Sequence, residues 1–376
     1  MMALGLTIAA VTLLILHLGA IALYLIRLAR PEPKGGVIGQ PFVTLLRPVC
    51  GLDPFDAETL RSSFHQDYPQ YEIIFCAQTP DDPVIPLVRR LIAQHPHIPA
   101  RLLVGLDRKT GNPKLNNVWK GWQQATGDWI CMTDSNLMLP RNYLANVVGS
   151  WGPSTGLVSS PPVGIMPQNM AGHLECAFLN GNQALLQHAA ASAGMGFAQG
   201  KTLFFNKPML EHAGGLHLLG QTLAEDAAAT RVVREMGRRV SLTPLPSGQP
   251  IGKRSLKQVW DRQLRWSRIR RDAFPLLFMF EIFNGALLPV TFAFAASLAQ
   301  DLNPLWGLGY AAIWYQAELG LNRRAGWPTG WHTLSLFILR DLMMPAIWLA
   351  TYLRRGFEWR GTPLDPTAGH TALPAA

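Results

Sequence analysis

Charged residues are scarce in this chain. Lys, Arg, Asp and Glu make up only 15% of the 376 residues, whereas hydrophobic residues make up 48%, and the formal net charge is +9. In ordinary soluble domains about a quarter of the residues are charged. The composition therefore argues against a cytosolic enzyme and favours a membrane protein.

Cysteine is rare as well, and the common nucleotide-binding loops are missing. The four cysteines form no Cys-x-x-Cys pair, which argues against a zinc site or a disulfide framework and fits a reducing compartment. The ten histidines show no metal-ligand spacing. Neither G-x-G-x-x-G nor a Walker loop occurs, so ordinary dinucleotide dehydrogenases and P-loop enzymes are excluded.

The first long apolar run covers residues 4–28 and contains no charge before Arg27. About 20 apolar residues suffice to cross a bilayer. A cleaved signal peptide is the alternative, but the run lacks a basic leading region and a small-residue cleavage site. We therefore expect a transmembrane anchor at residues 1–30. Arg27, Arg30 and Lys34 predict that the block after it is cytoplasmic.

Three further apolar stretches occupy the C-terminal part of the chain, at residues 273–299, 304–321 and 331–353. They predict a region of membrane helices over residues 273–355, and thus a multi-pass protein. A tail rich in Pro, Gly, Thr and Ala follows at residues 361–376, and we expect it to be flexible.

The number of C-terminal spans is left open by the charges around them. If all three stretches cross, Arg354, Arg355 and Arg360 lie on the side that the charge rule disfavours. Glu281 and Asn284 would allow the first stretch to lie partly at the interface instead.

Residues 41–250 alternate short apolar runs with amphipathic stretches, which is typical of an α/β domain with a largely parallel sheet. We expect strands at residues 42–46, 71–76 and 129–132, and helices at residues 56–66, 83–95 and 117–125. Asp134 directly follows the third of these strands. Open α/β sheets bind ligands at the carboxyl ends of their strands, so a site is expected there.

Acidic residues occur at three loop positions that follow predicted strands or helices, as Asp81-Asp82, Asp134 and Glu225-Asp226. Each alone is also ordinary turn or helix-cap chemistry. Together with a polar patch at residues 114–117 and the cationic motif at residues 262–266, they could bind a metal diphosphate and activate a hydroxyl.

The order and spacing of these segments resemble the inverting, membrane-bound glycosyltransferases of the GT-A fold, a Rossmann-like nucleotide-diphospho-sugar transferase fold, and within them the ceramide glucosyltransferase family. The resemblance covers most of residues 41–250 and continues into the motif. The residues that carry it are Leu45 to Pro48, Gly51 to Pro54, Gln66 to Glu72, Asp81 to Pro83, Gly111 to Asn117, Asp134-Ser135, Ala213 to Gly215, Ala224 to Asp226 and Arg262-Gln263-Leu264-Arg265-Trp266.

The resemblance implies a role for each candidate residue. Asp226 would be the base that deprotonates the acceptor, and Asp134 would bind a divalent cation, Mg2+ or Mn2+, on the diphosphate. Arg265 would pair with the diphosphate, and Trp266 would pack near the acceptor or the membrane. The remaining assignments are Asp82, Lys114, Asn116, Asn117 and Gln263 to substrate binding and Arg262 to the catalytic motif.

Two positions depart from the family's pattern. Asn136 stands where many GT-A enzymes carry the second acid of Asp-x-Asp, which leaves the affinity and the identity of the metal open. Gln183 stands where animal ceramide glucosyltransferases carry a histidine, provided that Leu174-Glu175 marks the same place.

The resemblance further implies transfer of a single sugar, glucose from UDP-glucose, with inversion to the hydroxyl of ceramide. The donor could equally carry galactose, glucuronic acid or N-acetylglucosamine, and the acceptor could be diacylglycerol, a hopanoid or a polyprenyl phosphate. A non-catalytic sugar-nucleotide-binding membrane protein is the alternative of another class. The expected location is a bacterial inner membrane with a cytoplasmic catalytic domain; the oligomeric state is left open.

Residues 251–272 interleave cations with Leu, Val, Ile and Trp at helical spacing. This pattern predicts a basic amphipathic helix that docks on anionic lipid. A solvated helix at the domain edge is the alternative, and a nucleic-acid patch is not expected because no nucleic-acid-binding fold accompanies it.

Overall fold

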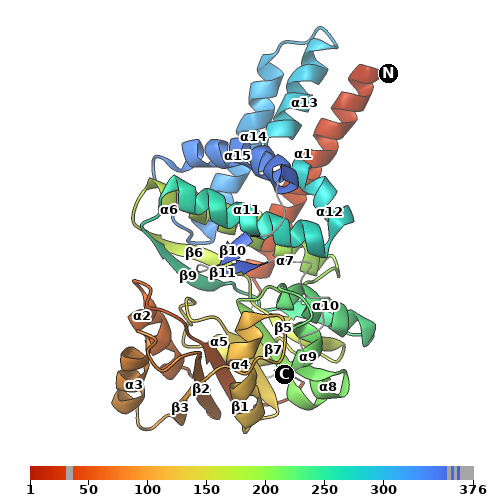
Figure 1. Ribbon diagram of the computed structural model, residues 1–376. Helices are drawn as coiled ribbons and strands as arrows, with labels where there is room; N and C mark the ends of the chain where they lie inside the picture. The colour runs from red at the N-terminus through yellow and green to blue at the C-terminus, as the bar shows by residue number, and fades with distance from the viewer. Residues whose placement is uncertain (31–36, 354–356, 360–361, 365–376) are drawn as a thin grey trace. The chain divides into compact units, whose positions relative to one another are not determined.

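The computed structural model of the chain describes residues 1–30, 37–353, 357–359 and 362–364 (Figure 1). The chain divides into two compact units. The helical unit contains Met1–Ala29, Val163–Ala189 and Ile251–Pro363, and the sheet unit contains Arg30–Pro162, Ala190–Pro250 and Leu364–Ala376. The expected flexible tail at residues 361–376 lies almost wholly outside the described residues, as do Lys34, Arg354, Arg355 and Arg360.

The sheet unit is built on seven strands in the order β3-β2-β1-β4-β7-β5-β8. The strands β1, β2, β3 and β4 are parallel, β7 is antiparallel to both β4 and β5, and β5 is parallel to β8. The expected α/β class is confirmed. The bounds are β1 Val43–Pro48, β2 Tyr71–Ala77, β3 Ala100–Val104, β4 Trp129–Thr133, β5 Thr155–Ser159, β7 Thr202–Asn206 and β8 Arg239–Leu242.

Helices cover both faces of this sheet, because successive strand residues point to opposite sides. Leu45 packs into one core and Leu46 into the other. The first core includes residues of α2 (Asp56–Arg61), η1 (Ser62–Phe64), α3 (Ile85–Gln94) and α5 (Tyr143–Gly149). The second is formed with α4 (Pro113–Gln124), α8 (Lys207–His212), α9 (Gly215–Leu219) and α10 (Glu225–Glu235).

Helix α4 begins four residues earlier than the sequence pattern indicates. The side chain of Asn112 accepts hydrogen bonds from the backbone amides of Lys114 and Leu115, and Pro113 occupies the first turn. Asn is a favourable N-cap, and Pro fits the first helical position because its missing N–H has no partner there. Lys114 is thereby fixed in the first turn, at the carboxyl edge of the sheet.

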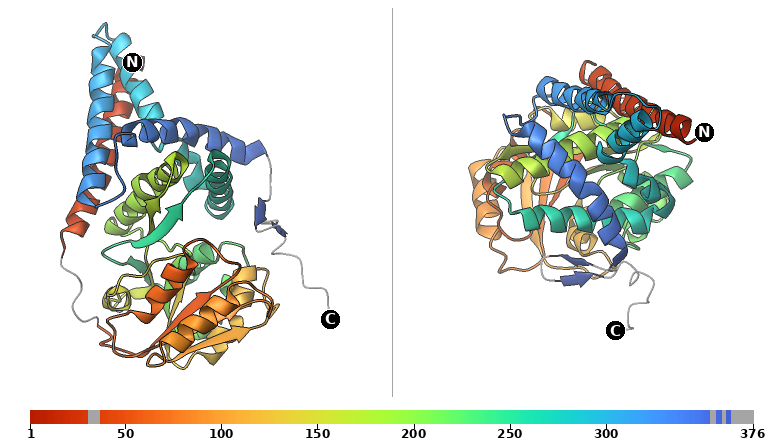
Figure 2. Two further views of the ribbon diagram at one scale, coloured as in Figure 1. Left: turned by 90° about the vertical axis from the view of Figure 1, so that its left-hand side faces the viewer. Right: turned by 90° about the horizontal axis from the view of Figure 1, so that it is seen from above.

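The helical unit contains the membrane candidates. Among the described residues, α1 (Met2–Leu28) and α15 (Thr333–Leu353) are each long and apolar enough to cross a membrane. A third span would consist of two helical segments, Pro275–Phe283 (α12 and η3) and Leu287–Leu298 (α13), which meet at a bend of 53°. Helices α1, α13 and α14 lie side by side in Figures 1 and 2. Further bounds are α6 Met170–Ala177, η2 Phe178–Ala184, α7 Leu185–Ser192, α11 Leu256–Ala273, α12 Pro275–Phe280, η3 Glu281–Phe283, α13 Leu287–Leu298 and α14 Leu305–Arg324.

Buried charges join the helices of this unit. Arg340 of α15 forms ion pairs with Glu318 of α14 and, at 2.8 Å, with Asp341. Asp341 also accepts hydrogen bonds from the backbone amide of Ala286 at 2.9 Å and from the hydroxyl of Tyr315 at 3.1 Å. Buried charges need such partners. The Asp341 carboxylate thus satisfies an amide at the break between η3 and α13, where the bend occurs.

Two small sheets accompany these units. Strands β6 (Pro162–Pro167) and β9 (Ser247–Gly252) pair in a two-stranded sheet. Strands β10 (Phe357–Trp359) and β11 (Thr362–Leu364) form another.

Candidate active site

A lysine and three acidic residues meet at the carboxyl end of the sheet. The ammonium group of Lys114 lies 2.7 Å from Oδ1 of Asp134 and 2.8 Å from Oε1 of Glu225. The same nitrogen donates to the carbonyl of Gly200 at 2.6 Å. Asp134 follows β4, while Glu225 and Asp226 open α10. The structure therefore brings together three candidates that lie far apart in the sequence.

A second lysine, which sequence reasoning missed, completes this cluster. Nζ of Lys201 lies 2.8 Å from Oδ2 of Asp134 and 3.0 Å from Oδ1 of Asn136. Lys201 directly precedes β7, and its carbonyl accepts a hydrogen bond from the amide of Asp134 at 3.1 Å. The antiparallel pairing of β7 with β4 creates this contact, and no local pattern around Lys201 signals that pairing.

The lysines keep Asp134 ionised. Burial by itself would raise the pKa of Asp134, but the ammonium groups of Lys114 and Lys201 outweigh burial and hold that pKa well below its usual value. Burial would lower the pKa of Lys114, and the charges of Asp134 and Glu225 reverse this effect and raise it. At neutral pH Asp134 and Lys114 are therefore both charged.

The Asp226 carboxylate has the properties of a proton acceptor. Burial, and after it the negative charge of Glu225, raise the pKa of Asp226 to about 6. Oδ2 accepts a hydrogen bond from the amide of Gly200 at 2.9 Å, and Oδ1 accepts one from the amide of Ala227 at 2.8 Å. A carboxylate with a pKa near the working pH is suited to general base catalysis.

Asp82 joins the loops that follow β1 and β2. Its two oxygens accept hydrogen bonds from the amide of Gly51 at 3.0 and 3.1 Å, and Oδ1 also accepts one from Val84 at 3.0 Å. Gly51 has a φ of 68°, a conformation that favours glycine. Contact between Asp82 and a uridine stays a prediction.

The two asparagines of α4 also shape loops at this edge. Oδ1 of Asn116 accepts hydrogen bonds from the amides of Lys109 and Thr110 at 3.1 and 2.8 Å. Nδ2 of Asn117 donates to the carbonyl of Cys76 at 2.8 Å, at the end of β2. Both side chains thus position backbone segments next to the site, and their direct contact with a nucleotide stays a prediction.

Arg47 holds the loop that carries Asp134. This arginine lies on β1 and is fully buried, and its Nη2 donates to the carbonyls of Ser135 at 3.0 Å and Leu137 at 3.3 Å. Burial lowers the pKa of Arg47 to about 10, so it remains charged at neutral pH. Arg47 belongs to a segment that carries the family resemblance, but the sequence did not indicate that its side chain holds this loop.

The cationic motif lies on α11, in the helical unit, and packs against α6. Nε of Arg262 lies 3.1 Å from Oε1 of the fully buried Glu175, and its guanidinium covers the ring of Trp266 at 4.4 Å. Gln263 donates to Glu175 at 3.3 Å and accepts from Gln183 at 3.0 Å. The position flagged by the sequence, Gln183, therefore contacts the motif.

Other cations of α11 also have acidic neighbours. Arg270 pairs with Glu281 at 2.8 Å, and Lys257 pairs with Asp261 at 2.6 Å. The expected helix is present. Its docking on lipid and the pairing of Arg265 with a diphosphate stay predictions.

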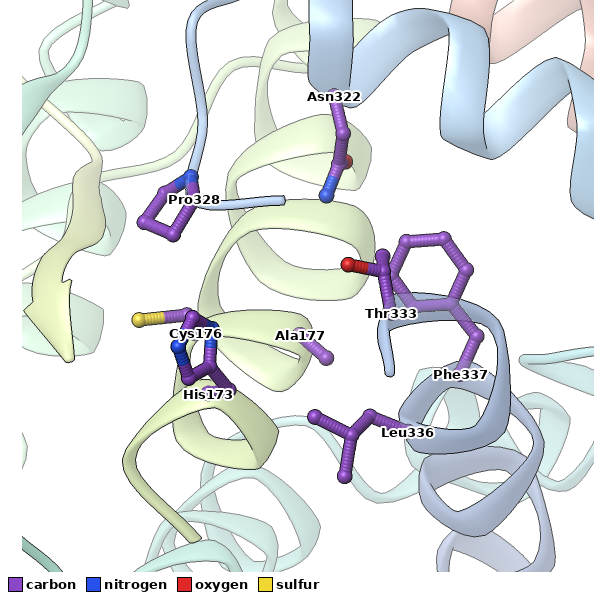
Figure 3. A pocket seen from close by; sticks show the side chains of 8 residues that line it. All are labelled: His173, Cys176, Ala177, Asn322, Pro328, Thr333, Leu336 and Phe337. Atoms are coloured by element: carbon purple, nitrogen blue, oxygen red, sulfur yellow. The ribbon is translucent and has the colours of Figure 1, made fainter. Parts of the chain in front are cut away.

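A small pocket lies in the helical unit between α6 and the start of α15 (Figure 3). Its polar side chains include His173 and Asn322, and burial lowers the pKa of His173, so this ring is neutral at neutral pH. The lining therefore lacks the positive charge that a diphosphate needs, and the donor site is better placed in the sheet unit. The lining residues are His173, Cys176, Ala177, Asn322, Pro328, Thr333, Leu336 and Phe337.

Comparison with known proteins decides the family. The family model described as Glycosyl transferase family 21 matches residues 7–372, nearly the whole chain. The chain belongs to glycosyltransferase family 21. The resemblance inferred from the sequence motifs is thereby confirmed.

Relatives of this family 21 glycosyltransferase include ceramide glucosyltransferases. Ceramide glucosyltransferase 3 of Caenorhabditis elegans is 23% identical over 349 residues, which cover 89% of this chain and 74% of the relative. A ceramide glucosyltransferase of Komagataella phaffii is 29% identical over 419 residues, with 85% and 81% covered.

The GT-A fold of this glycosyltransferase is also confirmed. A mannosyltransferase from Pyrobaculum calidifontis, solved in complex with GDP-Man and Mn2+, has a similar structure with a TM-score of 0.53. It covers 93% of this chain, and 98% of the mannosyltransferase is covered, at 22% sequence identity. At this identity the likeness establishes the fold alone.

The residues around Asp134 fit a resident divalent cation poorly. Within the described part of the chain, no group of three or more His, Cys, Asp or Glu residues is arranged to hold a metal ion. The neighbouring residue 136 supplies an amide side chain, Asn136, instead of a second carboxylate. Each carboxylate oxygen of Asp134 faces an ammonium group. A hard cation needs oxygen ligands in those directions.

Proposed function

We propose that this family 21 glycosyltransferase transfers a single sugar, glucose from UDP-glucose, with inversion to the hydroxyl of a lipid acceptor, ceramide. The observation that carries the proposal is the position of Asp226, with its pKa of about 6, beside an array of two lysines and Asp134 at the carboxyl edge of the sheet. The ceramide glucosyltransferases among its relatives support the choice of donor and acceptor.

The reaction needs one base and one centre of positive charge. Asp226 accepts the proton of the acceptor hydroxyl while the hydroxyl oxygen attacks the anomeric carbon from the side opposite to UDP. The bond between that carbon and the diphosphate oxygen breaks in the same step, and the electron pair leaves with UDP. Positioned positive groups stabilise the charge that develops on the leaving oxygen.

The remaining candidates of the sheet unit belong to the donor site in this proposal. Asp82 and the first turns of α4 hold the nucleotide, with Lys114 directed at the diphosphate. The family resemblance further assigns Arg262, Gln263 and Arg265 of the motif to the diphosphate and Trp266 to the acceptor, and these roles stay predictions. A guanidinium is suited to this task because its parallel N–H groups match two phosphate oxygens.

A divalent cation, Mg2+ or Mn2+, is the cofactor that the resemblance implies, with Asp134 as its protein ligand. When bound, such an ion would neutralise charge on the diphosphate. The ammonium groups on both oxygens of Asp134 argue against it, and no step above depends on it.

The membrane is the source of the acceptor in this proposal. Helices α1 and α15 can each cross a bilayer, and the exposed apolar side chains of α12 continue the apolar surface of the helical unit. We propose a multi-pass protein of a bacterial inner membrane whose sheet unit faces the cytoplasm. Diacylglycerol, a hopanoid and polyprenyl phosphate are the other acceptors to be tested.

Mass spectrometry of lipids from a host that lacks glycolipids, before and after expression of the chain, tests the proposal. A new hexosylceramide in cells supplied with ceramide is the expected product. A sugar on another lipid would correct the acceptor. If purified protein releases no UDP in response to any of these lipids, with or without divalent cation, the chain is a binding protein and the proposal fails.

A further inference from the structure

We infer that the ammonium groups of Lys114 and Lys201 supply the positive charge for the donor diphosphate, so that donor binding and sugar transfer need no divalent cation. This inference rests on the proposed function, because it concerns the same UDP-sugar. It assigns Lys201 to the donor site as a residue that contacts the substrate.

The geometry around Asp134 is the first argument. Lys114 lies 2.7 Å from one carboxylate oxygen and Lys201 lies 2.8 Å from the other. A cation that used either oxygen would have to displace an ammonium group and then remain close to it. Two positive groups therefore already occupy the places that a metal would take beside this carboxylate.

The neighbours of the lysines are the second argument. Lys114 is held by Glu225 at 2.8 Å and by the carbonyl of Gly200 at 2.6 Å, and Lys201 is held by Oδ1 of Asn136 at 3.0 Å. Replacing a second carboxylate by the neutral Asn136 weakens a cation site, whereas an amide oxygen suffices to orient an ammonium group. The neutral Asn136, which departs from Asp-x-Asp, therefore suits an ammonium group at this place, and Lys201 supplies that group.

The lysines can reach a ligand from these positions. The side chains of Lys114, Lys201 and Asp134 are 17%, 14% and 24% exposed, so each of them retains some contact with solvent. Ammonium groups on flexible four-carbon chains can turn from Asp134 toward phosphate oxygens. As the anomeric carbon separates from the diphosphate, the lysine N–H groups donate hydrogen bonds to the oxygens that gain negative charge, and no proton is transferred.

Binding of UDP to the purified full chain, measured by calorimetry in detergent with EDTA or with added MgCl2 or MnCl2, tests the inference. We expect the wild-type Kd to change by less than about threefold between these conditions, because lysine already provides the charge. A wild-type protein that binds UDP only with a divalent cation overturns the inference.

Variants at position 201 separate charge from folding. Lys201→Met should weaken UDP binding in EDTA by about tenfold or more, and Lys201→Arg should retain most of the affinity. Arg90→Met, at an exposed position of α3 in the sheet unit, is the matched control and should bind as wild type. Equal UDP affinity of Lys201→Met and wild type, with unchanged thermal midpoints, would exclude a role for Lys201 in donor binding.

A double variant tests the complementarity directly. Asn136→Asp with Lys201→Met removes the ammonium group and supplies the second carboxylate, so UDP binding should become stimulated by Mn2+ by about tenfold. A double variant that ignores Mn2+ contradicts the proposed exchange of lysine for metal. If wild type binds UDP without cation but forms no glycolipid, only the proposed function fails.

Discussion

Oδ2 of Asp226 accepts a hydrogen bond of 2.9 Å from the backbone amide of Gly200. The carbonyl oxygen of the same glycine accepts a hydrogen bond from Lys114. One residue therefore positions both the candidate base and the candidate diphosphate ligand. A Cβ at this position would lie 2.8 Å from Oε1 of Glu225 and 3.5 Å from Oδ2 of Asp226. The absence of a side chain at residue 200 therefore permits the close approach of these groups.

The Asp226→Asn variant should lose transfer and keep most of its UDP affinity. The amide cannot accept the acceptor proton, and loss of a general base typically costs about 100-fold to 10,000-fold in rate. Glycolipid formation and calorimetric UDP binding measure the two effects. Asp67→Asn, at an exposed ion pair with Arg141, is the control and should behave as wild type. Full turnover by Asp226→Asn would exclude Asp226 as the base.

The rate should fall in acid with a midpoint near the pKa of Asp226, about 6. Below that pH the carboxyl is protonated and cannot accept a proton, so kcat/KM should decrease about tenfold per pH unit. Glu225→Gln removes the neighbouring negative charge that raises this pKa and should move the acid limb to lower pH. An acid limb that stays in place in this variant would contradict the coupling.

The Arg262→Met variant should lower thermal stability, whatever its effect on catalysis. It leaves the fully buried Glu175 without its charged partner, and breaking a buried pair costs about 3–5 kcal/mol. The double variant Arg262→Met with Glu175→Leu should recover much of this loss, because no buried charge then remains. Thermal midpoints of wild type, Arg262→Met, Glu175→Leu and the double variant, all in one detergent, provide the measurement. Additive losses would show that the two side chains are not coupled.

The Gly121→Ala variant should destabilise the sheet unit by about 1–3 kcal/mol, because overpacked cores force neighbours to shift. A Cβ at this position of α4 would lie 2.5 Å from Cδ1 of Leu46 and 2.6 Å from Sγ of Cys76. Gly320→Ala, in α14, is the matched control, since a Cβ there meets nothing within 4 Å. An unchanged thermal midpoint for Gly121→Ala would mean that α4 can move away from the sheet.

The strands near the N-terminus could be predicted from the sequence because their apolar residues are local and continuous. Strands were expected at residues 42–46, 71–76 and 129–132, and the structure has β1, β2 and β4 there with small differences at their ends. The placement of Asp134 after β4 followed from the same local pattern.

Contacts made by distant segments could not be predicted in this way. Lys201 reaches Asp134 only because β7 pairs antiparallel with β4, and Glu225 reaches Lys114 only through the packing of α10 on the sheet. The family resemblance named the acids and the motif. Lys201 lies outside the segments that carried that resemblance, so neither route indicated it.

The buried arginine of β1, Arg47, affects how much free energy is needed to order the site when the donor binds. Arg47 holds the segment of Ser135 and Leu137 to the protein interior, so the orientation of Asp134 is set when the chain folds rather than when the proposed donor binds. Ordering a loop on binding consumes part of the interaction energy. A segment that is already ordered avoids this loss, so more of the free energy of donor binding is available to stabilise the transition state in which the glycosidic bond breaks.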